Sequence, residues 1–283
     1  MTGRVVLVTG ATAGIGAVTA RELARRGAHV IGVGRNAVKG AALVEGWRQE
    51  TGNPNITFLA ADLAEQDQVR ALAEEVRRRH DRLDVLVNNA GGYFARRQEN
   101  AEGREQTWAL NHLSYFLLTH ALLEQLLASA PARIVNVSSD AHQGGRLNFA
   151  DLEGRRRYDG FAAYGQSKLA NVLFTYELAR RLRGRGVTAN ALHPGFVATN
   201  FGLNNGGVLA AGLRLIQRWF ARTPEQGAAT SIYLASAPEV ADVTGQYFVD
   251  SRPARSAAAT YDEALARRLW EVSEAMTAPA GGR

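Results

Sequence analysis

Short apolar runs, mostly of β-branched residues, alternate along the whole chain with longer segments of helical periodicity. Seven such runs predict buried strands, at residues 5–8, 30–33, 56–59, 85–87, 134–137, 188–192 and 247–249. The intervening segments predict helices at residues 15–26, 38–50, 66–79, 105–128, 163–183 and 225–236. Strands that are apolar on both faces and alternate with helices are typical of a parallel sheet between two helical layers. The sequence therefore predicts an α/β fold, a Rossmann-type doubly wound seven-stranded parallel sheet.

No Pro/Gly/Ser-rich linker or internal repeat divides the chain, so we expect a single domain over residues 1–277 and a flexible tail over 278–283. Two segments interrupt the alternation, at residues 140–161 and 202–222, and each follows the carboxyl end of a predicted strand. Ligands bind at those ends in open α/β sheets. We expect the first segment to line a substrate site and the second to form a lid over it.

The chain of 283 residues contains no cysteine, which excludes disulfides and thiolate metal sites and favours a cytoplasmic location. The six histidines lack the close pairing of zinc ligands, so no metal site is expected. The apolar pattern begins by Val5, so neither a signal peptide nor an N-terminal membrane anchor is expected. The net charge of +6 comes mainly from arginines that alternate with glutamates on predicted helices. That pattern is typical of solvated faces, so we expect a small-molecule substrate and no nucleic acid.

A glycine-rich turn joins the first predicted strand to the first predicted helix. Gly10, Gly14 and Gly16 permit a tight turn and a close approach of the backbone to phosphate, and the helix N-terminus offers N–H groups. Many helices also follow a glycine without binding a ligand. The position of this turn between the first strand and the first helix favours a dinucleotide site.

Tyr164 and Lys168 are spaced to lie on one face of a predicted helix. A fixed positive charge favours the ionised phenol, so we expect Lys168 to lower the pKa of Tyr164. Such a phenol can exchange a proton with an alcohol or a carbonyl oxygen. A single Tyr-x-x-x-Lys pair is common on surfaces, but beside the glycine turn it predicts a hydride-transfer enzyme.

Four motifs follow one another along the chain: T-G-x-x-x-G-I-G from Thr9, N-N-A-G from Asn88, the tetrad of Asn111, Ser139, Tyr164 and Lys168, and Pro194-Gly195. Together they resemble the short-chain dehydrogenase/reductases. The resemblance implies reversible hydride transfer between a nicotinamide and a carbonyl carbon, in which Tyr164 exchanges the proton and Lys168 also holds the nicotinamide ribose. It further implies that Ser139 binds the carbonyl oxygen and that Asn111 holds a water.

Other polar residues near the tetrad in sequence are alternatives or receive structural roles. Ser138 competes with Ser139, and the family's pattern favours the second serine of N-V-S-S. His112, His142 and His193 are interpreted as hydrogen-bonding or packing residues, because the tyrosine already fills the acid–base role.

By the same resemblance, residues after each of the first strands and near Pro194-Gly195 contact the cofactor: Gly10, Thr12, Gly14, Ile15, Gly16, Asp62, Leu63, Asn89, Ala90, Gly91, Tyr164, Lys168, Pro194, Gly195 and Thr199. At the end of the second strand, an acidic residue would accept the ribose hydroxyls and repel a 2′-phosphate. Gly34 occupies that position and Arg35 follows, which predicts a preference for NADP(H) over NAD(H). The alternative is that Arg35 is an ordinary surface residue.

Further segments, among them Asp140-Ala141-His142, resemble the retinol-dehydrogenase branch over nearly the whole chain. Animal members of that branch commonly have an N-terminal membrane anchor. No such anchor is expected in this chain, so retinoid handling at a membrane is not expected either. An apolar stripe predicts either lid packing or a pocket wall for a lipophilic aldehyde or ketone. The stripe consists of Leu209, Leu213, Ile216 and Phe220.

Two other functions are less consistent with the sequence. An NADP(H)-binding sensor without turnover gains nothing from the complete tetrad, and a nucleotide-sugar epimerase would have another glycine spacing and a larger C-terminal domain. The family commonly forms homodimers or homotetramers through the helices predicted at 105–128 and 163–183. The segment 140–161 would obstruct that contact, so a monomer stays open.

Overall fold

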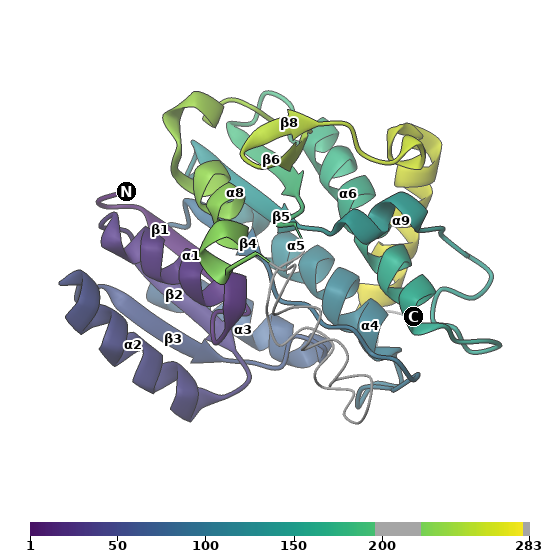
Figure 1. Ribbon diagram of the computed structural model, residues 1–283, viewed down its shortest axis with the longest axis horizontal. Coiled ribbons are helices and arrows are strands. Elements are labelled where there is room, and N and C mark those ends of the chain that lie inside the picture. The colour runs from purple at the N-terminus through teal and green to yellow at the C-terminus, as the bar shows by residue number, and fades with distance from the viewer. Residues whose placement is uncertain (196–221, 280–283) are drawn as a thin grey trace.

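The computed structural model describes residues 1–195 and 222–279. Eight strands in this part of the chain form one sheet in the order β3-β2-β1-β4-β5-β6-β7-β8 (Figure 1). Their bounds are β1 Val5–Thr9, β2 His29–Gly34, β3 Ile56–Ala60, β4 Val85–Asn88, β5 Ala132–Val137, β6 Val187–Leu192, β7 Tyr247–Val249 and β8 Arg252–Ala254. Neighbouring strands are parallel from β3 to β7, and β8 pairs antiparallel with β7.

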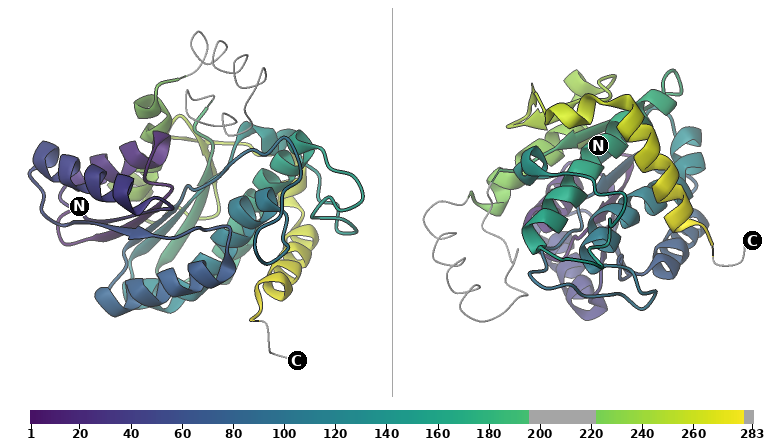
Figure 2. Two further views of the ribbon diagram at one scale, coloured as in Figure 1. Left: turned by 90° about the horizontal axis from the view of Figure 1, so that it is seen from below. Right: turned by 90° about the vertical axis from the view of Figure 1, so that its right-hand side faces the viewer.

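Helices cover both faces of the sheet (Figure 2). One layer contains α1 Gly14–Arg25, α2 Ala37–Thr51 and α8 Pro224–Ser236, and the other contains α3 Gln66–Arg79, α5 Ser114–Ala128 and α6 Gly160–Arg181. A short helix, α4 Gln106–Trp108, and a π-helical turn, Ala109–Leu113, lead into α5. Short 3-10 turns occupy Asp140–Gly144, Pro238–Val240 and Ala258–Tyr261. The last helix, α9 Glu263–Thr277, packs on α5 and α6 through Trp270, whose ring lies 5.2 Å from that of Phe116.

Each central strand contributes to two hydrophobic cores because successive side chains point to opposite faces of the sheet. In β1, Val6 and Val8 pack with the layer of α1, α2 and α8. Leu7 packs with the layer of α3, α5 and α6. This two-sided burial explains why the strands show continuous apolar runs rather than alternation. Because the strands from β3 to β7 are parallel, their carboxyl ends lie at one edge of the sheet.

The predicted single α/β domain and all seven predicted strands are confirmed. The eighth strand was missed because its three residues, Arg-Pro-Ala, are exposed and carry no apolar pattern. It returns through a tight turn at Asp250 and Ser251, whose φ angles are 49° and 59°. The amphipathic helix α9 was also missed, although Asp262 caps its N-terminus. Residues 202–221 of the expected lid and the whole apolar stripe lie outside the described residues.

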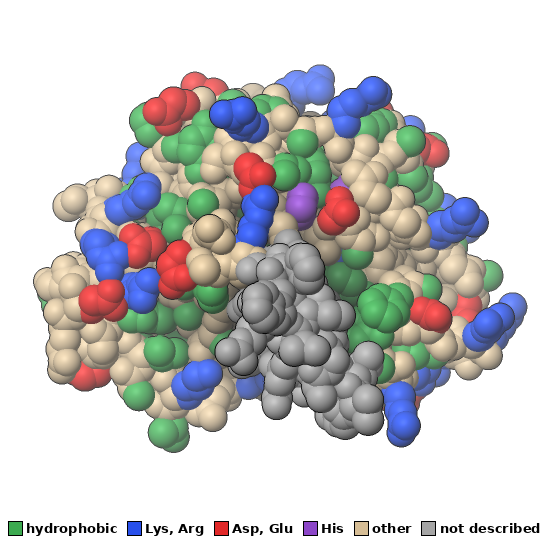
Figure 3. Space-filling view, viewed as in Figure 1, with side chains coloured by type: hydrophobic (Ala, Val, Ile, Leu, Met, Phe, Trp, Pro, Cys, Tyr) green, Lys and Arg blue, Asp and Glu red, His purple; other side chains and the backbone are tan. Residues whose placement is uncertain are grey.

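Within residues 1–195 and 222–279, none of the helices combines the length and the apolar character that a membrane span requires. On the face formed by α1, α2 and α8, basic and acidic side chains are interspersed (Figure 3). Arg25 of α1 pairs there with Glu22 and Glu50. The described part of this face therefore has the mixed charge of a solvated surface.

Candidate active site

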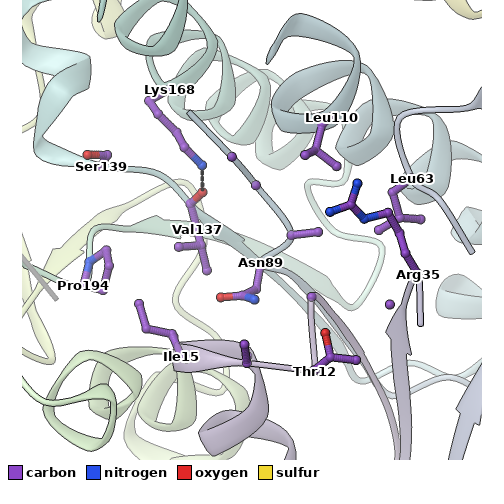
Figure 4. Close-up of a pocket in the computed structure, with 18 of the residues that line it drawn as sticks. Thr12, Ile15, Arg35, Leu63, Asn89, Leu110, Val137, Ser139, Lys168 and Pro194 are labelled. Atoms are coloured by element: carbon purple, nitrogen blue, oxygen red, sulfur yellow. Dashed lines mark hydrogen bonds between the residues drawn. The ribbon is translucent and has the colours of Figure 1, made fainter. Parts of the chain in front are cut away.

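A cavity of about 780 Å³ lies at the carboxyl ends of the parallel strands (Figure 4). Loops after β1 to β6 line it, together with the first turn of α1 and with Tyr164 and Lys168 of α6. Sixteen of the predicted site residues meet there: Gly10, Thr12, Gly14, Ile15, Gly16, Arg35, Asp62, Leu63, Asn89, Ala90, Gly91, Ser139, Tyr164, Lys168, Pro194 and Gly195. Asn111 lies behind the cavity wall, and Thr199 is outside the described residues.

The glycine turn packs directly against the loop after β4. Gly10 has a φ of +68°, and a Cβ there would lie 2.9 Å from the Cα of Ala90. A Cβ on Gly16 would lie 2.4 Å from the carbonyl oxygen of Gly10. Asn89 closes the contact, because its Nδ2 donates to the Thr9 carbonyl at 2.8 Å. Only glycine therefore permits this approach, and Asn89 has a structural role beside its predicted cofactor contact.

The N-terminus of α1 is built differently from those of most helices in the described chain. At α2, α4, α6, α8 and α9, a cap side chain accepts a hydrogen bond from a first-turn N–H. The cap of α1 is Ala13, which offers no such acceptor, and Gly14, Ile15 and Gly16 line the cavity. Uncapped N–H groups at a glycine turn suit a phosphate, so this end of the cavity fits a dinucleotide.

Gly34 ends β2 beside this turn. A Cβ at Gly34 would lie 2.8 Å from Cγ2 of Thr12, so a larger residue requires Thr12 to move. The next residue, Arg35, points towards the cavity (Figure 4), and its side chain is 70% exposed. Its Nη1 lies 3.8 Å from Oδ2 of Asp62, which makes only a loose ion pair. The guanidinium therefore remains available to an anionic ligand.

Tyr164, Lys168 and Ser139 converge at the other end of the cavity. Nζ of Lys168 donates to the carbonyl oxygen of Val137 at 3.1 Å and lies 5.7 Å from the centroid of the Tyr164 ring. Ser139, which follows β5, shares a side-chain hydrogen bond with Tyr164. The neighbouring Ser138 instead donates from its buried hydroxyl to the carbonyl of Lys168 at 2.8 Å. This arrangement favours Ser139 over Ser138 as the serine that faces a substrate.

The pKa values of Tyr164 and Lys168 differ from the expectation. Burial raises the pKa of Tyr164 to about 12, and the hydrogen bond with Ser139 only partly opposes the shift. Burial also lowers the pKa of Lys168 to about 7. The expected lowering of the tyrosine's pKa by the lysine is therefore not observed, because desolvation dominates both groups.

Asn111 lies in the π-helical turn before α5 and clamps the loop that follows β4. Its Oδ1 accepts from the backbone N–H of Gly92 at 2.8 Å, and its Nδ2 donates to the Gly92 carbonyl at 3.0 Å. Nδ2 also donates to the hydroxyl of Ser167. The side chain thus positions the loop beside Lys168, and its predicted water-holding role stays a prediction.

A buried histidine, His112, is linked through hydrogen bonds to Asn111 of the tetrad. His112 contacts Asn171 at 3.3 Å through Nδ1 and Ser273 of α9 at 2.8 Å through Nε2. Asn171 in turn donates to the backbone carbonyl of Asn111 at 2.8 Å. Burial lowers the pKa of His112 to about 4, so it is neutral at physiological pH. The hydrogen-bonding role predicted for this histidine is confirmed.

Several cavity residues were not predicted. Gly92, Phe94, Gln98, Leu110 and Val137 line the cavity. Tyr93 adds an aromatic contact, with its ring 6.3 Å from that of Tyr164 and 4.9 Å from that of Phe161. The run Gly-Tyr-Phe directly after N-N-A-G was the available signal, because it continues a loop already assigned to the site.

The family model for short chain dehydrogenases matches residues 4–206. The chain belongs to the short-chain dehydrogenase family. It is 44% identical to retinol dehydrogenase 12 of Mus musculus over 271 residues, which are 96% of this chain and 85% of that protein.

Solved structures agree with this assignment. A crystal structure of an uncharacterised protein from Mycobacterium paratuberculosis matches with a TM-score of 0.79 and 36% identity, over 98% of this chain and 94% of the other. The NADP active-site complex of Pseudomonas aeruginosa RhlG matches with a TM-score of 0.70 and 30% identity, over 88% and 94% of the two chains. This short-chain dehydrogenase is thus an oxidoreductase that acts on an alcohol or carbonyl group.

Proposed function

We propose that this short-chain dehydrogenase uses NADP(H) to interconvert a lipophilic aldehyde or ketone and its alcohol, with Tyr164 as the proton-transfer group. The main support for the proposal is that one cavity has a catalytic group of residues at one end and an anion-binding turn at the other. Tyr164, Lys168 and Ser139 meet at one end, and the uncapped glycine turn and Arg35 lie at the other.

The cofactor assignment extends along the cavity. The turn and the first N–H groups of α1 would hold the pyrophosphate, and Arg35 would hold a 2′-phosphate. Asp62 and Leu63 would flank the adenine, whereas Asn89–Gly91, Tyr164 and Lys168 would line the ribose and nicotinamide path. Pro194, Gly195 and Thr199 would meet the nicotinamide end. When bound, the nicotinamide supplies or accepts the hydride.

The chain's own residues supply the proton and stabilise charge. The high pKa of Tyr164 keeps the phenol protonated at neutral pH, which is the form that can give its proton to a carbonyl oxygen. The hydroxyl of Ser139 accepts from the backbone N–H of Ala141 at 3.2 Å, so its own proton can be donated to that oxygen. A protonated Lys168 would stabilise negative charge as it develops at the tyrosine.

The substrate class follows from the lining and from the relative. Phe94, Leu110 and Val137 contribute apolar side chains to the lining of the cavity. The matched mouse protein is named for retinol, a lipophilic primary alcohol. Both observations support a lipophilic aldehyde or ketone and its alcohol as the reacting pair.

The test is NADPH consumption against medium- and long-chain aldehydes, aromatic ketones and retinal, with Tyr164→Phe as the matched control. We expect turnover with at least one apolar carbonyl, and a loss of at least a hundredfold in the control with NADPH binding retained. NADPH binding without turnover of any carbonyl, or of the matching alcohols with NADP⁺, would instead indicate a sensor.

A further inference from the structure

The loop that carries Ser139 is connected to the C-terminal part of the chain through one buried imidazole. His142 is fully buried, three residues after Ser139. Its Nδ1 lies 2.7 Å from the carbonyl oxygen of Ser139, and its Nε2 lies 3.1 Å from the backbone nitrogen of Ala257. The imidazole therefore bridges two backbone groups that are far apart in the sequence.

These partners define the protonation state of the ring. A backbone carbonyl can only accept a hydrogen bond and a backbone N–H can only donate one. Nδ1 of His142 must therefore carry the proton, and Nε2 must be the acceptor. His193 shows the opposite arrangement, because its Nδ1 accepts from the backbone N–H of Gly195 at 3.0 Å.

The bridge is anchored at its far end. Ser256, the residue before Ala257, is bonded through its hydroxyl to Tyr176 of α6 at 2.8 Å and to Thr260 at 2.6 Å. The backbone N–H of Ala257, which donates to His142, is thus held beside a hydrogen-bond network that is attached to α6.

At its near end, the bridge completes the restraint on Ser139. The Ser139 carbonyl also accepts from the backbone N–H of His142 at 3.1 Å, so both of its lone pairs are used. The hydroxyl accepts from Ala141. Hydrogen bonds therefore restrain both the backbone carbonyl and the side-chain hydroxyl of Ser139.

The surroundings keep the ring neutral. His142 is in contact with Tyr247, whose ring centroid lies 4.8 Å away, and Asp140 and His193 are the other titratable groups that act on it. Burial lowers its pKa below the ordinary value, although the hydrogen bond to the Ser139 carbonyl and the charge of Asp140 oppose the shift. A proton on Nε2 would face the N–H of Ala257 without an acceptor, and this geometry independently disfavours the charged ring.

We propose that His142 is a positioning residue for catalysis, which fixes Ser139 through its carbonyl and couples it to the segment at Ala257. The proposal rests on the proposed role of Ser139. It adds that the C-terminal segment, which does not line the described cavity, determines how well Ser139 is oriented.

The first test needs no turnover. In ¹⁵N-histidine spectra of the wild-type protein at pH 8, we expect His142 to show a protonated Nδ1 and an unprotonated Nε2, and His193 to show the reverse. A protonated Nε2 on His142 at that pH would overturn the proposal. This result stands whether or not the proposed NADPH-dependent activity is found.

The second test separates the two ends of the bridge. In His142→Asn, the amide nitrogen can replace Nδ1 and keep the bond to Ser139, whereas in His142→Gln the amide oxygen can replace Nε2 and keep the bond to Ala257. We expect kcat to be at least tenfold higher for the Asn variant than for the Gln variant, with the same Kd for NADPH. His120→Asn, which removes another histidine bonded to a backbone carbonyl but remote from Ser139, should leave kcat unchanged. Equal kcat values in the two His142 variants would refute the positioning role.

Discussion

Replacement of Arg35 by alanine tests the basis of the NADP(H) assignment. The guanidinium lies after β2, beside a glycine that offers no acidic group to the ribose. Its described ion pair is the loose contact with Asp62 at 3.8 Å, between two partly exposed groups. Loss of such a pair changes stability by at most about 1 kcal/mol, so Arg35→Ala should fold normally.

The expected loss concerns the 2′-phosphate alone. A hydrogen bond to a charged group contributes about 1.5–3 kcal/mol. Because the Arg35 side chain is 70% exposed, we take the lower end of that range. A value of about 1.4 kcal/mol corresponds to a factor of about ten in Kd. Arg35→Ala should therefore weaken NADPH binding about tenfold and leave NADH binding unchanged.

Fluorescence titration of both dinucleotides measures the two dissociation constants, and the ratio of Kd(NADPH) to Kd(NADH) is the quantity of interest. Arg78→Ala is the matched control, because its side chain is 68% exposed and the same charge is lost far from the cavity. An unchanged ratio in Arg35→Ala, or an equal change in Arg78→Ala, would refute the assigned role of Arg35.

Three further predictions address the turn, the lysine and the serine. Gly16→Ala would place a Cβ 2.4 Å from the Gly10 carbonyl, so the turn must shift; we expect at least a tenfold loss of NADPH affinity in a binding titration. The lowered pKa of Lys168 means that the unfolded chain holds one more proton between pH 7 and about 10, so wild-type stability should rise over that window. Urea unfolding at pH 7 and pH 9.5 should show this rise in the wild type and not in Lys168→Met. A parallel change in both proteins would contradict the lowered pKa of Lys168. Ser139→Ala should lower kcat at least a hundredfold in steady-state kinetics, whereas Ser138→Ala should mainly lower the Tm, and the reverse pattern would exchange their roles.

The fold was predictable where one physical rule dominated. Strands buried on both faces must be apolar throughout, and all seven such runs form strands. The strand at Arg252–Ala254 follows no such rule, because an exposed edge strand can have almost any composition. The helix at Glu263–Thr277 is amphipathic, but its apolar face depends on Trp270 meeting α5 and α6, which the local sequence does not specify.

For the candidate site, the sequence predicted which residues lie together better than it predicted their pKa values. The spacing of Tyr164 and Lys168 correctly indicated that both line one cavity. It did not indicate that Lys168 is only 4% exposed, and the desolvation of each group determines the direction of its own pKa shift. Likewise, the contacts of Asn111 with Gly92 and Ser167 join residues that only the folded chain brings together.

The central claim is that hydride transfer to a carbonyl is coupled to proton donation by Tyr164. The most direct measurement uses NADPH deuterated at nicotinamide C4 with the best carbonyl of the panel, and follows the label by mass spectrometry. The account predicts deuterium on the carbinol carbon of the product for the wild type, and at least a hundredfold slower labelling for Tyr164→Phe with NADPH still bound. Labelling at an equal rate in Tyr164→Phe would contradict the role of the tyrosine, and no labelled alcohol from any carbonyl would contradict the proposed reaction itself.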